Sequence, residues 1–366
     1  MFNDRDLQEL LDFSASDPVL SVYLNTDPQE GNADAYRLRL RSMLKDVKSV
    51  ADVAVVERYF NHEYDWAGRS VAVFSCNAQK FFRAFPFAIS IRSQVHIADR
   101  TSVQPLTNLM DIYGGYGVAL VDQQGARLFY FHLGELREQE GLLGVSIKRT
   151  KRGGASSFPG RRGGTAGQTR AVEEAVERNM RESAEFAMEF FESHHVRRIL
   201  IGGTDDNVAQ FRGMLPKSWQ SLIVGSFPIS MTASHTEVLA RAMEIGIQSE
   251  RRREDRLVEN LLTNAAKGGQ AVVGLKDTLD AVNASRALTL VIAEEYHDPG
   301  FRCPGCDRLS PTAGKACETC GKTAEPIPDL VEAAINAVLR NRGGVEVVHA
   351  SPVFQKAGSI GAILRY

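Results

Sequence analysis

The sequence predicts an α/β protein with three domains. Its 366 residues exceed the length of one typical domain, which is roughly 100–200 residues. With 43% hydrophobic and 24% charged residues, the chain has the composition of an ordinary globular protein and enough apolar material for real cores. Short segments with strand-like alternation are interleaved with segments of helical periodicity, and this order is typical of α/β domains.

The first predicted domain covers residues 1–105 and forms a small α/β unit. Apolar, alternating segments predict its strands, and two segments between them have helical spacing. The domain contains no phosphate-binding glycine motif and no obvious catalytic constellation. The expected strands are 19–25, 70–76 and 81–91, and the expected helices are 33–50 and 51–64.

The second predicted domain covers residues 106–230. Gln123, Gln124 and Gly125 separate two apolar segments and predict the turn of a β-hairpin. A basic, glycine-rich loop at 148–170 follows, and Thr169 is placed to cap the next helix. The loop is therefore expected between a sheet and a helix N-terminus, a location that favours anions. The expected strands are 117–122, 126–133, 197–203 and 222–229, and the expected helix is 171–192.

A connecting helix is expected over residues 231–265, with its helical pattern beginning near His235. Its centre at 249–256 is densely charged with mixed sign, which predicts a solvated helix between two domains. The third predicted domain covers residues 266–366 and is a small three-layer α/β fold. Its expected helices are 272–284 and 329–341, and its expected strands are 288–296, 345–350 and 361–366.

The loop at 148–170 concentrates positive charge on a chain whose formal net charge is −2. Between Leu142 and Val172 there are seven Lys or Arg residues, seven glycines and no Asp or Glu. Lysine and arginine neutralise phosphates, and glycine lets a backbone approach a partner closely. The pattern indicates a mobile basic loop that enters a phosphate-rich place. A disordered basic linker is the alternative interpretation.

Two cysteine pairs predict a metal site within an insert at 299–325. Cys303 and Cys306 form one C-x-x-C motif, and Cys317 and Cys320 form a second after ten intervening residues. Four thiolates with this spacing can close a tetrahedral site around Zn²⁺, and full coordination by protein makes the ion structural rather than catalytic. Disulfides and a redox dithiol are the alternatives. The fifth cysteine, Cys76, is expected to be a buried, small apolar side chain.

The composition argues against membrane and secreted proteins. No apolar run approaches the roughly 20 residues that span a membrane. Residues 1–13 are acidic and amphipathic, and they lack the basic start and apolar run of a signal peptide. We therefore expect a cytoplasmic protein with no membrane partner.

The order of parts over residues 106–366 resembles the archaeal and eukaryotic class I peptide chain release factors and Pelota. A sheet, a basic glycine loop, a long helix and an α/β domain with a Cys-pair insert follow one another, and residues 269–296 are similar to the opening of the family's third domain. The resemblance implies a middle domain whose Gly-Gly-Gln loop reaches the ribosomal peptidyl-transferase centre. It also implies a third domain like the kink-turn RNA-binding ribosomal proteins, which docks a translational GTPase and in some members holds a zinc-knuckle insert. The first domain lacks the family's Asn-Ile-Lys-Ser motif and is similar to the divergent N-terminal domain of the bacterial branch.

Two segments compete for the Gly-Gly-Gln role. The literal match at 268–270 follows the connecting helix without basic neighbours and is interpreted as a helix C-cap. The positional match is RRGGTAGQTR at 161–170, where Ala166 and Gly167 precede Gln168 in place of two glycines. In the family the glycines let the Gln backbone amide meet a developing oxyanion while water attacks the peptidyl-tRNA ester. The implied catalytic residues are Gly163, Gly164, Gly167 and Gln168, and the implied RNA-binding residues are Lys148, Arg149, Lys151, Arg152, Arg161, Arg162 and Arg170.

Two functions of different classes follow from the resemblance. A release or rescue enzyme would enter the ribosomal A site and hydrolyse the peptidyl-tRNA ester, with Gln168 positioning the water. A Balon-like hibernation factor would occupy the same site without chemistry. A free RNA-binding protein or tRNA-acting enzyme is a more distant alternative. The implied partners are the ribosome, through ribosomal RNA and peptidyl-tRNA, and a translational GTPase such as elongation factor Tu.

Overall fold

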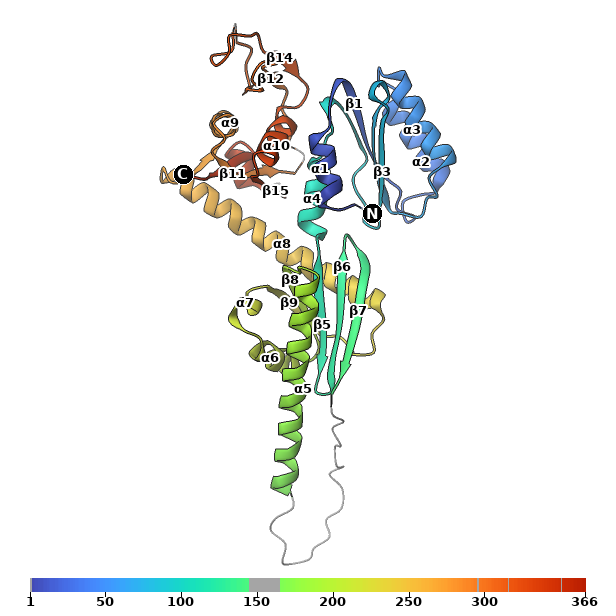
Figure 1. Ribbon diagram of the computed structural model, residues 1–366, viewed down its shortest axis with the longest axis vertical. Helices are drawn as coiled ribbons and strands as arrows, with labels where there is room; N and C mark the ends of the chain where they lie inside the picture. Colours follow the sequence, from blue (N-terminus) through green and yellow to red (C-terminus); the bar gives the residue numbers. More distant parts are fainter. Residues whose placement is uncertain (1, 145–164, 295, 315, 350) are drawn as a thin grey trace, which may run out of the picture. The chain divides into compact units, whose positions relative to one another are not determined.

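The computed structural model describes residues 2–144, 165–294, 296–314, 316–349 and 351–366 (Figure 1). The chain divides into two compact units. Unit 1 combines Met1–Ile112 with Arg251–Tyr366, and unit 2 is Tyr113–Glu250. Both units contain sheets covered by helices, so the mixed α/β class is confirmed. The expected division into three domains stays a prediction.

The N-terminal part of unit 1 is an antiparallel sheet with helices on both faces. Its elements are α1 Asp4–Asp12, β1 Ser14–Asn25, α2 Ala33–Leu44, α3 Val50–His62, β2 Ser70–Cys76, the 3₁₀ turn η1 Asn77–Gln79, β3 Phe81–Phe87, β4 Gln94–Arg100 and α4 Gln104–Tyr113. The strand order is β3-β2-β1-β4. Leu20, Val22 and Leu24 of β1 pack against α2 and α3, whereas Tyr23 points to the opposite face and meets Phe74.

The expected strands and helices of this part are confirmed with shifted ends. Strand β2 has the expected bounds, and all seven of its residues are buried because helices cover both faces of the sheet. The expected strand at 81–91 ends at Phe87. The sequence patterns missed α1, β4 and α4. Helix α1 could have been found, because Asn3 and Asp6 form a capping box at its start. Cys76 is buried, as expected.

The C-terminal part of unit 1 is a mixed sheet in a three-layer arrangement (Figure 1). Its elements are the last part of α8 His235–Ala266, β10 Ala271–Val273, α9 Leu275–Asn283, β11 Ala287–Ala293, α10 Leu330–Arg340, β15 Gly344–Val348, α11 Pro352–Lys356 and β16 Ile360–Leu364. The strand order is β10-β16-β11-β15, and only the β11–β15 pair is parallel. Val258 and Leu261 of α8 join Phe354 of α11 in a core against β11. Helices α9 and α10 contact the sheet through β16 and β11.

The helix expected at 272–284 is partly wrong. Val272 and Val273 form strand β10, and α9 begins only at Leu275. The intervening Gly274 has φ +85°, a conformation that breaks a helix and that glycine adopts at little cost. The remaining helix and strands of this part are confirmed within a few residues, apart from positions 295 and 350, which lie outside the described residues.

Between β11 and α10 the chain forms a small antiparallel sheet, and the four paired cysteines lie in the loops that connect its strands. It consists of β12 Gly300–Arg302, β13 Leu309–Ser310 and β14 Glu325–Ile327, in the order β13-β12-β14. Strand β12 pairs with both neighbours. These strands begin and end close to the insert expected at 299–325.

Unit 2 is a five-stranded sheet with α5, α6 and α7 on one face and the first part of α8 on the other. Its elements are β5 Tyr116–Asp122, β6 Gly125–His132, β7 Glu135–Leu143, α5 Thr165–Ser193, β8 Arg198–Gly202, α6 Asp205–Met214, α7 Lys217–Gln220 and β9 Ile223–Phe227. The order is β7-β6-β5-β8-β9, with β5, β8 and β9 parallel. Met180, Ala184 and Phe191 of α5 pack on one face, and Val238 and Ala242 of α8 pack on the other.

Two sequence expectations for the long helices need correction. Helix α5 begins at Thr165 rather than after Thr169, so Thr169 lies inside the helix and does not cap it. Helix α8 has the expected length, but its charged centre is not simply solvated, because Glu250 and Glu254 are buried. Glu250 lies 3.5 Å from Arg198, and Glu254 accepts a hydrogen bond from the His349 backbone N–H. Buried carboxylates of this kind require such partners.

Among the described residues, no helix is both long enough and apolar enough to cross a membrane.

Candidate functional site

The four cysteines of the insert converge as the sequence predicts. The sulfur atoms of Cys303, Cys306, Cys317 and Cys320 all lie within 4.8 Å of one another. The Cys303 and Cys320 sulfurs are 3.2 Å apart, and those of Cys306 and Cys317 are 3.5 Å apart. A disulfide needs a separation of about 2.05 Å, so these distances describe free thiols.

The two C-x-x-C turns have the same backbone conformation. In the first, the Asp307 N–H donates to the Cys303 carbonyl, and in the second the Gly321 N–H donates to the Cys317 carbonyl. The residue after each second cysteine has a left-handed conformation, with φ +56° at Asp307 and φ +74° at Gly321. Two matching turns face each other and present two sulfurs each, which is the geometry of a four-thiolate metal site.

Backbone N–H groups in these turns favour thiolates. The N–H of Thr319 has the largest part in lowering the pKa of Cys317 to about 6. The N–H of Gly305 is likewise the main cause that lowers the pKa of Cys303. Thiolates are the ligands that zinc prefers, so in each turn a backbone N–H favours the form of one cysteine that binds metal.

The second cysteine of the first turn behaves differently. The N–H of Arg308 favours the Cys306 thiolate, but the hydrogen bond between this thiol and Cys317 raises the pKa of Cys306 to about 12. A metal ion that bound all four sulfurs would displace this proton. Metal affinity is therefore expected to fall at low pH.

The sulfur positions fit zinc. A tetrahedron with Zn–S bonds of about 2.3 Å has edges of about 3.8 Å. The separations of 3.2 and 3.5 Å are somewhat shorter than this edge, and the upper limit of 4.8 Å is longer, so changes of no more than about 1 Å in the sulfur separations form the tetrahedron. His297 is not part of this group, because its Nδ1 lies 2.7 Å from an Asp329 carboxylate oxygen.

Most residues of the predicted RNA-contacting loop lie outside the described residues. This applies to Gly163 and Gly164 and to Lys148, Arg149, Lys151, Arg152, Arg161 and Arg162. The structure places Gly167 and Gln168 in the first turns of α5. Arg170 follows on the same helix, and its exposed side chain lies 3.2 Å from Glu174.

The basic segment leaves unit 2 at a fixed point on the sheet. Strand β7 ends at Leu143, and the Gly144 N–H donates to the Gln124 carbonyl at 2.6 Å. The Asn179 side chain donates to the neighbouring Gln123 carbonyl at 2.9 Å. A Cβ on Gly144 would lie 2.3 Å from the Asn179 oxygen, so only glycine fits there. Asn179 was not among the predicted site residues, although an Asn within an apolar helix face is a signal for such an anchor.

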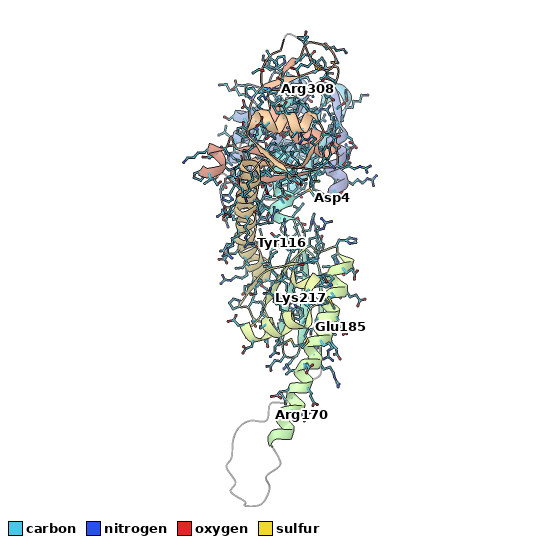
Figure 2. The ribbon with its side chains drawn as sticks, turned by 90° about the vertical axis from the view of Figure 1, so that its left-hand side faces the viewer. Asp4, Tyr116, Arg170, Glu185, Lys217 and Arg308 are labelled. Carbon is cyan, nitrogen blue, oxygen red and sulfur yellow. The ribbon has the colours of Figure 1, made fainter. Side chains whose placement is uncertain are left out.

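Helix α5 extends well beyond this anchor. Asn179 is its first buried residue among those whose side chains are described, and Arg170 to Arg178 are exposed or partly exposed. About fourteen residues separate Asn179 from the helix start at Thr165, which corresponds to about 21 Å of helix. Figure 2 shows Arg170 near this end of α5, away from Tyr116 in the sheet of the same unit. The basic segment therefore connects the sheet to the tip of a projecting helix.

The literal Gly-Gly-Gln sequence has the structural role expected for it. The Gly268 N–H donates to the Ala265 carbonyl and the Gly269 N–H donates to the Asn264 carbonyl, at 3.1 and 2.8 Å. Gly268 has φ +65°. These two bonds and the left-handed glycine form a Schellman C-cap of α8, and the interpretation of 268–270 as a helix end is confirmed.

The comparison with protein families identifies the part of the chain that carries the basic segment. Residues 102–246 match the family described as bacterial archaeo-eukaryotic release factor family 10. This span contains most of unit 2, including both anchors of the segment. The expected resemblance to release factors is confirmed over this span of the chain. No curated protein is significantly similar in sequence.

Several solved structures are similar to the chain at low identity. An archaeal translation termination factor, aRF1, is 15% identical over 99% of this chain and 96% of that one, with a TM-score of 0.28. Archaeoglobus fulgidus Pelota is 13% identical over 81% and 79%, with a TM-score of 0.34. S. cerevisiae Dom34, a termination-like factor that interacts with Hbs1, is 10% identical over 81% and 79%, with a TM-score of 0.40. These TM-scores are too low to support a conclusion about function.

Proposed function

We propose that this release-factor-like chain is a translation factor that binds the ribosomal A site and places its basic glycine-rich segment at the peptidyl-transferase centre. One observation carries the proposal: the release-factor family match at 102–246 encloses the segment with seven Lys or Arg residues and no acid. Release factors act on the ribosome, and a segment of this charge suits ribosomal RNA phosphates.

The geometry of unit 2 supports this role. The segment is held at Gly144 beside Asn179, and its other end joins α5 about 21 Å from that anchor. A projecting helix can carry its tip into a narrow channel while the sheet stays outside. The overall charge of −2 opposes nonspecific binding to RNA, and the segment is a local concentration of positive charge on the chain.

In the enzymatic form of the proposal, Gln168 positions the water that attacks the peptidyl-tRNA ester, and Gly163, Gly164 and Gly167 shape the surrounding backbone. Because the chain lacks the family's codon-reading motif, rescue of stalled ribosomes fits better than decoding of a stop codon.

A second candidate is a hibernation factor that occupies the A site without hydrolysis. One observation favours it: Gly167 and Gln168 lie within helix α5. In a regular helix a glycine follows the same backbone path as any other residue, so a helical Gly167 does not provide the unusual backbone conformation that the family's glycines allow. Hydrolysis would therefore require the first turn of α5 to unwind on the ribosome.

The experiment is peptide release from ribosomes that carry peptidyl-tRNA and an empty A site, with binding measured by co-sedimentation. Wild type is compared with Gln168→Ala and with Gln270→Ala, which alters the other Gly-Gly-Gln-like site and serves as the matched control. Release that is lost in Gln168→Ala and kept in Gln270→Ala supports the enzyme. Binding without release supports the hibernation factor, and absence of binding contradicts both.

The RNA contacts are tested by changing charge alone. Replacing Lys148, Arg149, Lys151 and Arg152 by Gln should weaken co-sedimentation and reduce its dependence on salt, because fewer counterions are released on binding. The control is Arg251→Gln with Arg252→Gln, an exposed basic pair on α8. Equal salt dependence of the two variants would contradict the proposed role of the segment.

We also propose that Cys303, Cys306, Cys317 and Cys320 bind one structural Zn²⁺. Purified protein should contain one zinc per chain, and Cys303→Ser with Cys306→Ser should remove it and destabilise unit 1. Cys76→Ala is the control, because this cysteine is buried outside the cluster and should leave the zinc content unchanged. Wild-type protein without bound metal would contradict the proposal.

A translational GTPase such as elongation factor Tu stays a predicted partner.

A further inference from the structure

One edge of the C-terminal sheet in unit 1 carries basic residues that belong neither to the zinc site nor to the 148–170 segment. Strand β16 runs antiparallel to β10 and β11, and β15 runs parallel to β11. The starts of β10, β11 and β15 and the end of β16 therefore meet at this edge. An exposed basic residue lies within four positions of each of these strand ends, and together the four residues form the basic edge: Lys267, Arg286, Arg342 and Arg365.

Hydrogen bonds between the connecting segments hold the basic edge together. The Arg365 backbone N–H donates to the Arg286 carbonyl at 2.9 Å, and the Arg365 guanidinium donates to the Asn341 carbonyl at 2.8 Å. On the side of β10, the Leu364 N–H donates to the Gln270 carbonyl at 3.0 Å. Neighbouring strands lie about 4.8 Å apart, so the four strand ends cover about 14 Å. The four basic residues are therefore arranged as a row along one edge.

The protein's own acids do not neutralise this row. The connecting segments 267–270, 284–286, 341–343 and 365–366 contain no Asp or Glu. Among the residues that the structure describes, no Asp or Glu forms an ion pair with the four basic side chains. The whole chain has 45 acidic and 43 basic residues, so this edge is a local excess of positive charge on a nearly neutral molecule. A row of uncompensated cations attracts a polyanion.

Arg342 occupies a backbone position that the fold alone would give to glycine. It has φ +56° and directly follows the C-cap of α10. Its N–H donates to the Leu339 carbonyl at 3.0 Å, and the Gly343 N–H donates to the Val338 carbonyl at 2.9 Å, which is a Schellman motif. Helices α8, α9 and α10 all end at this edge, and helix C-termini favour cations nearby. That preference does not require a side chain at the strained position, and strained residues are typical of functional positions.

We propose that the basic edge binds the phosphate backbone of RNA. A nucleic-acid backbone carries a regular row of negative charges, which a row of cations at neighbouring strand ends can contact one after another. Three of the four residues are arginines, whose planar donors match two phosphate oxygens. Contacts of this kind position RNA without reading its sequence. The choice of RNA among polyanions rests on the proposed function, and the basic edge is a second RNA-binding surface in addition to the 148–170 segment.

The test is fluorescence anisotropy of a short labelled RNA duplex, titrated with the full chain at several salt concentrations. Lys267→Gln with Arg342→Gln removes two charges from side chains that make no hydrogen bond or ion pair in the described part of the chain. This variant should bind RNA about tenfold more weakly, and the slope of log Kd against log salt should fall by about two. Arg251→Gln with Arg252→Gln makes an equal charge change at exposed positions of α8 and should bind like wild type.

A second pair of variants separates RNA binding from folding. Ser285, which follows the C-cap of α9, has φ +55° and the same left-handed conformation as Arg342, but no charge. Both Ser285→Gly and Arg342→Gly should raise the melting temperature, because glycine relieves the same strain. Only Arg342→Gly should weaken RNA binding and lower the salt slope, by about one. A more stable Arg342→Gly protein with wild-type affinity for RNA would count against the basic edge.

The outcomes distinguish this inference from the proposed function. The RNA duplex has no A site, so its binding does not depend on the ribosome assay, and the 148–170 segment is unchanged in every variant. Wild-type affinity and salt slope in Lys267→Gln with Arg342→Gln, or an equal loss in the α8 control, would overturn the proposal. So would the absence of RNA binding by wild type. Polyglutamate that binds as tightly as RNA and depends on Lys267 and Arg342 would identify an acidic protein as the partner, and RNA would be the wrong polyanion.

Discussion

Glu332 on α10 provides the sharpest test of the energetics of unit 1. Its carboxylate is 5% exposed and accepts hydrogen bonds from the N–H of Val103 at 2.7 Å and the hydroxyl of Ser102 at 3.2 Å. A weaker contact, at 3.4 Å, comes from the N–H of Gln104. Burial is the main cause that raises the pKa of Glu332 to about 7, and the two N–H groups oppose it. Nearby Asp329 adds to the rise.

The sign and size of the effect follow from this pKa. The folded protein holds the proton up to about pH 7, whereas the unfolded chain releases it near 4.5. Between these values the folded state binds more protons, so the free energy of unfolding falls as pH rises. The difference in pKa corresponds to about 3 kcal/mol, because each unit is worth about 1.4 kcal/mol. Most of this loss should fall between pH 5 and 8.

The perturbation is Glu332→Gln. The amide keeps an acceptor for the Val103 N–H, and its NH₂ can donate to the Ser102 hydroxyl, which rotates to accept. Only the long contact to Gln104 is lost. The variant should therefore be more stable than wild type at pH 8 by about 2–3 kcal/mol and nearly equal to it at pH 5.

The assay is urea unfolding at several pH values between 5 and 8. The chain has two tryptophans, Trp66 in unit 1 and Trp219 in unit 2, so a Trp219→Phe background makes fluorescence report on unit 1. The difference between Glu332→Gln and its parent cancels the titration of the cysteines, but not that of His297, whose pKa Glu332 itself helps to raise. A difference that does not change with pH would refute the reasoning, because the carboxyl group would then have an ordinary pKa.

Two further predictions concern backbone strain and a histidine. Gly268→Ala should cost about 1 kcal/mol, because its φ of +65° is strained for any residue with a Cβ although nothing lies within 4 Å of that position. Gly213→Ala in α6, equally open but helical, should instead stabilise by about 0.5–1 kcal/mol in thermal unfolding; equal effects of the two would contradict this. Burial opposes charge on His194, but the Phe190 carbonyl and the Glu138 carboxylate raise its pKa above 6.5. Its stabilising effect should be full below pH 6.5 and lost as pH rises through the raised value; a pKa at or below 6.5 by NMR would contradict this.

Local patterns predicted the elements whose structure depends on neighbouring residues. The strand at 70–76 is apolar throughout because both of its faces are buried, and the turn of Gln123 and Gln124 joins β5 to β6. The cap at 268–270 depends on bonds within six residues of chain. The cysteine cluster was predictable for the same reason, since each C-x-x-C turn fixes two sulfurs locally.

Features that depend on distant residues could not be predicted in this way. The acceptor for the N–H of Val103 lies 229 positions away at Glu332, and the ion-pair partner of Asp99 is Arg302 in the insert. Pairing of buried charges across such separations is set by tertiary packing, and a single sequence contains no periodic signal for it. The start of α5 was misplaced because Thr169 looks like a cap, while the helix continues toward the N-terminus through Gly167, a poor helix former.

The mixed-charge centre of α8, predicted to be solvated, instead contains two buried carboxylates that attach the helix to the rest of the protein. A solvated helix of mixed charge would leave Glu250 and Glu254 exposed, yet they are 5% and 4% exposed. Glu250 is paired with Arg198 inside unit 2, and Glu254 accepts from His349 inside unit 1. Removing one partner of a buried pair costs about 3–5 kcal/mol, because it leaves a charge without compensation. The boundary between the two units falls at Glu250 and Arg251, within one turn of both acids. On each side of this boundary, α8 is therefore attached to its own unit by a buried carboxylate, and both carboxylates belong to the charged sequence at 249–256.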